Sequence, residues 1–267
     1  MDLGPELGRR NLIAYNRALT RWASRGALEE DGDVVLCAGG TWVPVVANTA
    51  FRTGGRVDPA KLLARADAFF SSLARGFTVK VRDDGEDEDL RAACTAAGLE
   101  LFGGSAPEMI RRGPLPDPPP VGGVEVRLVD DEDGLQAFRA VNAAAYASYG
   151  MPAEVLGELF DRPEAVLGDP SAHIVLATRG DEAVATAMAY ESDGVASLQW
   201  VGTIPAARGV GLGALVTVVA TNLAFGRGAS SCTLQASPMG EPVYRRLGYE
   251  SLYRWAEYVR WPRPPGR

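Results

Sequence analysis

The stretch "TIPAARGVGLGALVTVVATNLAFG", residues 203–226, places alternating glycines between a strand-like run and a helix-like run. Gly209, Gly211 and Gly213 precede or open a helix that we predict over residues 211–225. A helix N-terminus presents unpaired N–H groups and a partial positive charge, and glycine lets a ligand approach them closely. The stretch therefore predicts either a tight strand-to-helix turn or a site for an anionic group such as a phosphate.

Two familiar phosphate-binding designs do not suit this stretch. A P-loop needs Gly-Lys-Ser/Thr at the helix start, and no lysine lies near Gly213. The dinucleotide fingerprint G-x-G-x-x-G/A is formally met by Gly209, Gly211 and Ala214. The next predicted strand, however, ends in "LQAS" (residues 234–237) and offers no acidic residue to hold a ribose.

A second motif downstream makes the pattern more specific. Residues 208–213 read "RGVGLG" after the strand "LQWVGTI" and Pro205, and residues 234–250 read "LQASPMGEPVYRRLGYE". Together they resemble the Gcn5-related N-acetyltransferases (GNAT). That family carries Gln/Arg-x-x-Gly-x-Gly/Ala between its fourth strand and the next helix, with a Tyr-x-x-Leu-Gly-Phe/Tyr turn further on. The resemblance covers Val124 to about Trp261.

The resemblance implies a binding site for acetyl-CoA, the acetyl donor. It implies that the backbone amides of the glycine-rich loop hold the pyrophosphate: Gly209, Val210, Gly211, Leu212, Gly213 and Ala214. It also implies that the fourth strand splays from the fifth, so that Val201, Gly202 and Thr203 bind the pantetheine arm like an added strand. Gly202 fits a bulge there. Arg208 offers a charge-assisted contact, or is an exposed loop arginine. Near the end of the fifth strand many relatives carry asparagine followed by a small residue, where this chain has Ala236-Ser237. Ser237 is a hydrogen-bond candidate for the arm.

The resemblance also assigns roles in the chemistry. Tyr244 is the leading general acid for the departing thiolate, and its alternative role is packing of a short helix. Glu191 and Gln199 are candidates for a water-mediated relay to the amine, although a glutamate at a turn is often simply solvated. His173, at a strand start far from both motifs, is expected to be structural.

A proline- and glycine-rich segment divides the chain. "RGPLPDPPPVGG", residues 112–123, blocks both helix and central strand. We predict an amino-terminal domain over 1–112, a linker over 113–123 and a catalytic domain over 124–267. The fold class is α/β (α+β), with two tandem GNAT-like domains, each a mixed, mostly antiparallel sheet flanked by helices. The amino-terminal half reads αββαβαβ, with its second strand over 42–51.

The amino-terminal half lacks the glycine-rich loop. Its equivalent stretch, "FRTGGRVDP" over residues 51–59, keeps Gly54 and Gly55 but no Arg-x-x-Gly-x-Gly. Asp58 would repel a phosphate at the following helix. We therefore expect a degenerate copy that no longer binds acyl-CoA and walls one side of the acceptor cleft.

The composition limits the kinds of binding partner that we expect. A net charge of −7 argues against binding of nucleic acid. No window resembles a membrane span or a signal peptide, and three scattered cysteines with one histidine make a metal site improbable. We expect a cytoplasmic protein without a metal. The sequence does not indicate the oligomeric state.

The sequence as a whole predicts an N-acetyltransferase. In this reading acetyl-CoA is the donor and a primary amine attacks directly in a ternary complex. Aminoglycosides, polyamines, amino acids and protein N-termini all stay open as acceptors. The alternatives are a non-catalytic acyl-CoA-binding or regulatory protein, and a structural module without activity.

Overall fold

The computed structural model describes residues 4–54 and 57–262. Its helices are α1 Gly4–Trp22, α2 Pro44–Ala47, α3 Pro59–Ser72, α4 Glu88–Ala96, α5 Glu132–Tyr146, α6 Val155–Leu159, α7 Pro163–Leu167, α8 Leu212–Gly226 and α9 Glu241–Arg246. Its strands are β1 Ala27–Asp31, β2 Val34–Ala38, β3 Asn48–Arg52, β4 Phe77–Arg82, β5 Glu100–Arg111, β6 Val124–Leu128, β7 Ala172–Arg179, β8 Glu182–Ser192, β9 Val195–Thr203, β10 Ser231–Gln235 and β11 Glu250–Arg260. Short 3-10 turns cover Ala147–Tyr149 and Pro205–Ala207.

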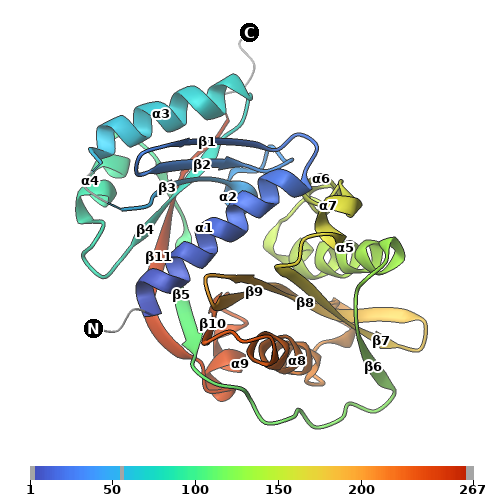
Figure 1. Ribbon diagram of the computed structural model, residues 1–267. Coiled ribbons are helices and arrows are strands. Elements are labelled where there is room, and N and C mark those ends of the chain that lie inside the picture. The colour runs from blue at the N-terminus through green and yellow to red at the C-terminus, as the bar shows by residue number, and fades with distance from the viewer. Residues whose placement is uncertain (1–3, 55–56, 263–267) are drawn as a thin grey trace.

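The described strands form one continuous, mostly antiparallel sheet (Figure 1). Its order is β1-β2-β3-β4-β11-β5-β10-β9-β8-β7-β6. The parallel pairs are β3 with β4 and β9 with β10, and each is joined by a crossover helix, α3 or α8. The two halves of the chain therefore repeat the same strand–helix–strand unit on either side of the sheet centre. The mixed, helix-flanked sheet agrees with the predicted fold class.

The two halves exchange their last strands at the centre of the sheet. β11, from the end of the chain, lies between β4 and β5, while β5 pairs with both β11 and β10. Residues 113–123 connect the halves without helix or strand. The segments 1–112 and 124–267 thus share their central strands.

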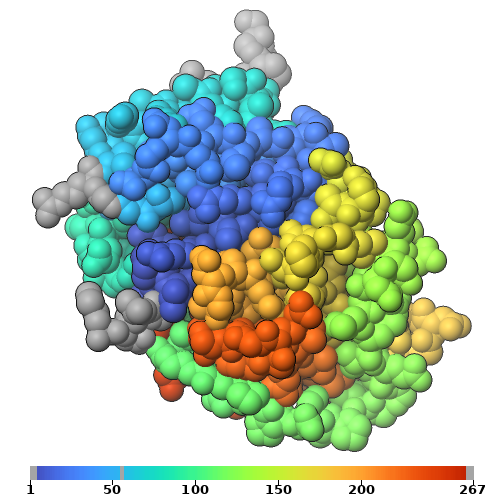
Figure 2. All heavy atoms as spheres, in the orientation of Figure 1, coloured from blue at the N-terminus to red at the C-terminus, as the bar shows by residue number. Residues whose placement is uncertain are grey.

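Helices cover both faces of the sheet and bury separate cores. On one face, α1 and α5 pack on β7 and β8 through Trp22, Phe138 and Tyr190. On the other face, α8 packs on the carboxy-terminal strands and α3 and α4 on the amino-terminal strands. α1 belongs to the first half but crosses to the second, where the Asn11 amide donates to the carbonyl oxygens of Tyr190 and Val195. Figure 2 shows the two halves packed directly against each other on this side.

One local prediction was wrong, and two short elements were not predicted. Residues 44–47 form α2 within the expected strand 42–51, because Pro44 sets a helical φ at the first turn and Asn48 bonds the Thr41 carbonyl. β1, with the sequence ALEED, was missed because acidic residues are rare in strands. α7 was missed because it is only five residues long.

The described residues contain neither a membrane-spanning helix nor a cluster of metal ligands. None of the described helices has the length and apolarity that a bilayer crossing needs. The same residues contain no group of His, Cys, Asp and Glu side chains that could hold a metal ion.

Candidate functional site

Glycine occurs at the alternating positions for two different structural reasons. Gly209 and Gly211 have φ values of 84° and 89°, which side chains rarely tolerate, so the turn into α8 requires glycine there. Gly213 has no such requirement, and an added Cβ would meet only the Thr203 hydroxyl oxygen, at 3.6 Å. The third glycine therefore leaves open space in front of the first turn of α8.

Beside this turn, β9 separates from β10. The two strands pair only from Val195 to Leu198, while the rest of β9 pairs with β8 alone. Trp200 and Val201 stand together opposite Ala187, and Trp200 has a φ of 53°. The bulge thus lies at Trp200 and Val201, one residue before the predicted position. Among the described strands, this separation leaves one edge of β9 at residues 201–203 without a partner.

Gly202 is needed for packing and not for the bulge. It pairs normally with Thr186, and a Cβ there would lie 2.7 Å from the Asn142 side-chain oxygen and 3.2 Å from the Ala145 Cβ, both on α5. Glycine therefore lets α5 lie directly on β9. This contact brings the end of α5, with Tyr146, next to the separated strands.

A cavity of about 380 Å³ occupies the space between the glycine turn, β9 and α9. We call it the glycine-loop cavity. Its lining includes most of the predicted binding residues: Val201, Gly202, Thr203, Arg208, Gly209, Gly211, Leu212, Gly213, Ala214, Ser237 and Tyr244. Val210 is absent from that lining and borders a neighbouring groove beside residues 115–122. The two sequence motifs therefore meet around one cavity.

Tyr244, on α9, lines this cavity. It is 8% exposed, and its ring packs on Tyr249 with centroids 6.0 Å apart. Burial raises the pKa of its phenol well above the ordinary value, so the group stays protonated at neutral pH. Within the described residues its hydroxyl makes no hydrogen bond. The same side chain thus packs and presents an available proton donor.

Arg208 and Ser237 already have partners. The Arg208 guanidinium donates to the carbonyl oxygens of Ala145, at 2.9 Å, and Thr203, at 3.3 Å, and so ties the end of α5 to the loop. The Ser237 hydroxyl oxygen accepts from the Gly240 amide and from the Tyr149 hydroxyl at 3.2 Å. Arg208 thus shapes the cavity whether or not its side chain also meets a phosphate.

A second cavity, of about 250 Å³, lies on the opposite face of the sheet beneath α1 and α2. We call it the central cavity, because both halves line it: Tyr15, Asn16 and Lys80 from the first, Gln199, Gln235 and Glu257 from the second. Tyr146, Val201, Ser237 and Tyr244 line both cavities. The two cavities therefore meet where β9 and β10 separate.

Glu191 and His173 stand apart from both cavities. They face each other at the ends of β8 and β7, with His173 Nε2 3.6 Å and Arg227 Nε 3.4 Å from Glu191 Oε1. Burial raises the pKa of the Glu191 carboxyl and lowers that of the His173 imidazole. Neither side chain lines the glycine-loop cavity or the central cavity. Of the two predicted relay candidates, the structure brings only Gln199 to the central cavity.

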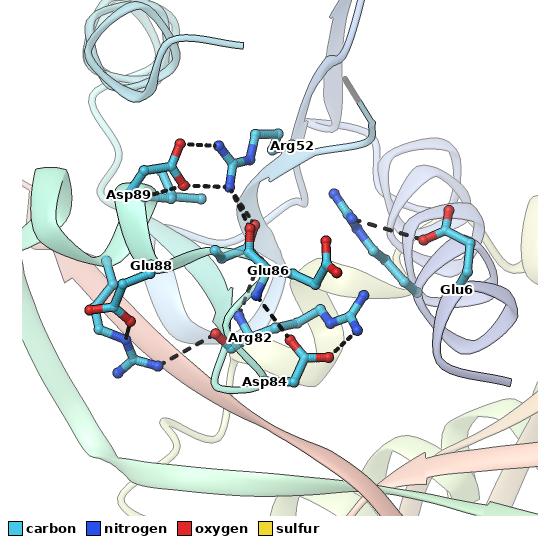
Figure 3. Close-up of polar contacts among 11 residues, drawn as sticks. Glu6, Arg52, Arg82, Asp84, Glu86, Glu88 and Asp89 are labelled. Carbon is cyan, nitrogen blue, oxygen red and sulfur yellow. Dashed lines mark hydrogen bonds and ion pairs between the residues drawn. The ribbon is translucent and has the colours of Figure 1, made fainter. Parts of the chain in front are cut away.

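The equivalent place in the amino-terminal half holds an ion-pair cluster (Figure 3). Arg52, at the end of β3, is 8% exposed and binds the carboxylates of Asp87, at 2.7 Å, and Asp89, at 2.8 Å. Arg82, at the end of β4, pairs with Asp84. Asp58 caps α3 by accepting from the Ala60 amide. Gly55 lies outside the described residues. Arg52 and the aspartate carboxylates that it binds thus occupy the region where β3 and β4 end.

Several lining residues had no sequence motif to reveal them. Trp200 donates from its indole nitrogen to the Tyr15 hydroxyl, which joins the bulge to α1. Tyr146 donates to the Val201 carbonyl oxygen at 3.3 Å. The paired tyrosines in "YASYG", residues 146–150, were the only local signal. Tyr15 and Lys80 come from the other half of the chain, so only the tertiary fold could identify them.

Comparisons with known proteins agree with this geometry. Residues 120–240 match the family model described as "Acetyltransferase (GNAT) domain". A GCN5-related N-acetyltransferase from Kribbella flavida is similar in structure, with a TM-score of 0.70 and 24% identity, covering 96% of each chain. A tandem GNAT protein from the clavulanic acid biosynthesis pathway is similar with a TM-score of 0.62 and 17% identity, over 91% of this chain and 86% of that one. None of the curated proteins compared matches the sequence.

The family match falls on the half that contains the glycine turn, and the structural likeness extends over both halves. Residues 120–240 therefore resemble a GNAT acetyltransferase domain in sequence, within a chain that has the fold of the GCN5-related N-acetyltransferases.

Proposed function

We propose that the protein transfers the acetyl group of acetyl-CoA to a primary amine in a ternary complex, with Tyr244 as general acid. The observation that carries this proposal is the meeting of two cavities at Tyr146, Val201, Ser237 and Tyr244. One cavity lies at a helix N-terminus suited to a pyrophosphate. The other opens on the opposite face of the sheet, so that an amine can reach the thioester from that side.

In this proposal the donor lies in the glycine-loop cavity. The amides of residues 209–214 bind its pyrophosphate, and the open space before Gly213 allows close approach. The unpaired edge of β9 at residues 201–203 bonds the pantetheine arm as a strand would. Ser237 faces the arm from the other side.

The reaction then needs one bond exchange and three proton transfers. The amine nitrogen forms a bond to the thioester carbonyl carbon, and the carbon–sulfur bond breaks. The thiolate takes the phenolic proton of Tyr244, which is available because burial keeps that phenol protonated. The proton of the attacking amine passes to water, from which Tyr244 is protonated again.

The proposal also covers the organisation of the chain. Residues 124–267 carry the donor site, 113–123 are a linker, and 1–112 are a degenerate GNAT-like unit that walls the acceptor side. In support, Lys80 and Tyr15 line the central cavity, and Arg52 with its carboxylates fills the place equivalent to the donor site.

Release of free thiol from acetyl-CoA across a panel of amines tests the proposal. We expect thiol release that depends on both substrates, with a mass gain of about 42 Da on the amine. A protein that binds acetyl-CoA but acetylates no amine would favour the alternative, a non-catalytic acyl-CoA-binding or regulatory protein.

A further inference from the structure

The floor of the central cavity holds an ion pair that joins the two halves of the chain. Lys80 Nζ, on β4, lies 2.6 Å from Glu257 Oε1, on β11, and donates to Gln235 Oε1, on β10, at 2.9 Å. The Lys80 side chain is 10% exposed and that of Glu257 is 20% exposed. An ion pair this sheltered from water interacts more strongly than one at the surface.

The pair also has bonding capacity left over. The Lys80 ammonium has three N–H groups, of which two have acceptors, and Glu257 uses one of its two carboxylate oxygens. Among the described residues no other partner fills these positions. A ligand in the cavity can therefore find both a donor and an acceptor in the pair without separating it.

The remaining lining is uncharged, and it mixes polar groups with apolar side chains such as Leu12, Val45 and Met151. Asn16, Thr49, Gln199 and Gln235 supply amide and hydroxyl groups. Burial raises the pKa values of Tyr15, Tyr146 and Tyr244, so these phenols stay neutral. Lys80 and Glu257 are thus the charged groups that line the cavity among the described residues, and their charges cancel.

One more carboxyl group lies behind the pair. Glu108 is 2% exposed and accepts from the Trp255 indole at 2.9 Å, and it does not line the cavity. Burial raises the pKa of its carboxyl, which favours the uncharged form. The cavity therefore offers no unopposed charge to a ligand.

We infer that the Lys80–Glu257 pair selects an acceptor whose part beyond the reactive amine is uncharged and carries hydroxyl or amide groups, as in an amino alcohol. This inference rests on the proposed function. A second ammonium group that reached the free Glu257 oxygen would also meet the charge of Lys80, and a carboxylate that reached Lys80 would also meet the charge of Glu257. Each would therefore lose water without a net attraction from the pair. A hydroxyl group can bond either member of the pair or the neighbouring amides.

The place where the two cavities meet limits the size of this part. Gln235, which Lys80 bonds, precedes Ser237, which lines both cavities, by two residues, and two residues span at most about 7 Å. A chain of about four carbons between the amine and the hydroxyl group spans that distance.

A matched series of amines tests the inference: 4-amino-1-butanol, 1,4-diaminobutane and 4-aminobutanoate. They differ only in a terminal group that is neutral, cationic or anionic. We expect kcat/KM for the amino alcohol to exceed that of both others by at least about tenfold. Calorimetric titration into the CoA-saturated protein should give the same order of affinities.

Each single variant should leave one charge of the Lys80–Glu257 pair without its partner. Lys80→Met leaves Glu257 unopposed and should raise the preference for the diamine by about tenfold relative to the amino alcohol. Glu257→Gln leaves Lys80 unopposed and should raise the preference for the aminobutanoate. The double variant should again favour the amino alcohol. Asp67→Asn is the matched control, because Asp67 pairs with Arg260 of the same strand β11 but lines no part of the cavity.

The outcomes separate the inference from the proposed function. If the affinities follow this order but no thiol is released, the acceptor site stands and the transfer reaction does not. If thiol is released without opposite shifts in the two single variants, or if none of the three amines binds, the inference is overturned. If Glu257→Gln lowers kcat equally for all three amines and changes the acidic limb of the pH profile, Glu257 is a general base. That outcome also overturns the inference.

Discussion

Tyr244 has two roles to distinguish, because its ring packs in the core while its hydroxyl stays without a partner among the described residues. Tyr244→Phe removes only the hydroxyl group, so the thermal midpoint and the affinity for acetyl-CoA should hardly change. Turnover should fall by about 10²-fold, near the lower end for general acid catalysis, because water partly substitutes in an open cleft. Steady-state kinetics and calorimetry together measure both quantities.

The pH profile separates the acid role further. A general acid must carry its proton, so turnover is lost as pH rises through its pKa. Burial raises that pKa, which places this basic limb above the ordinary phenol value of about 10. Tyr244→Phe should abolish the limb, whereas Tyr258→Phe, in the core of the other half, should keep it. Near-normal turnover in Tyr244→Phe, or a lowered thermal midpoint, would assign this tyrosine to packing.

At the level of single residues, the sequence predicted site residues best where a motif requires a particular backbone conformation. Gly209 and Gly211 need left-handed φ values, and their spacing could be recognised without a structure. The sequence could not show whether Glu191 lies in the candidate site. In the structure, the side chain faces His173 and Arg227 instead of the cavities. The role of Lys80 could not be predicted, because its place in the cavity depends on the pairing of β4 with β11, which lie about 170 residues apart in the sequence.

Among the elements, a substitution at the start of α8 gives the most direct test of donor binding. Gly213→Asp puts a carboxylate into open space at a helix start, where the helix dipole favours it. The fold should therefore stay intact while acetyl-CoA binding weakens by at least about tenfold, equivalent to about 1.4 kcal/mol. Gly213→Ala is the matched control for volume without charge. Equal affinity in a folded Gly213→Asp protein would refute the pyrophosphate site.

Most elements followed from periodicity and turn residues. The hairpin at Asp193 and Gly194 forms because both residues take positive φ values, as the Asp-Gly pair predicts. The failures have local physical causes, such as Pro44, which starts α2 inside a run that otherwise alternates like a strand. Strand order across the sheet centre could not be predicted, because β5 and β11 are equally able to pair with several neighbours by pattern alone.

For the whole molecule, we predict one acetyl-CoA site per chain. In the first half Arg52 is held by Asp87 and Asp89 at the place equivalent to the donor site, and an anion would have to displace these carboxylates. Calorimetry should give a stoichiometry of one. Gly54→Asp, the counterpart of Gly213→Asp, should leave the affinity unchanged. Two equivalent sites would show that the first half also binds the donor.

The exchange of β5 and β11 has a consequence for how the chain reaches its native state. During synthesis β4 and β5 emerge early, but the strand that fits between them is made only after residues 112–249. At elongation rates of about 5–20 residues per second, the first half waits on the order of ten seconds with one edge of β4 unpaired. Exposed strand edges favour wrong pairing and aggregation. The nascent first half therefore depends on the carboxy-terminal strand to complete its fold, and substitutions near residue 255 should act on its yield as much as on its stability.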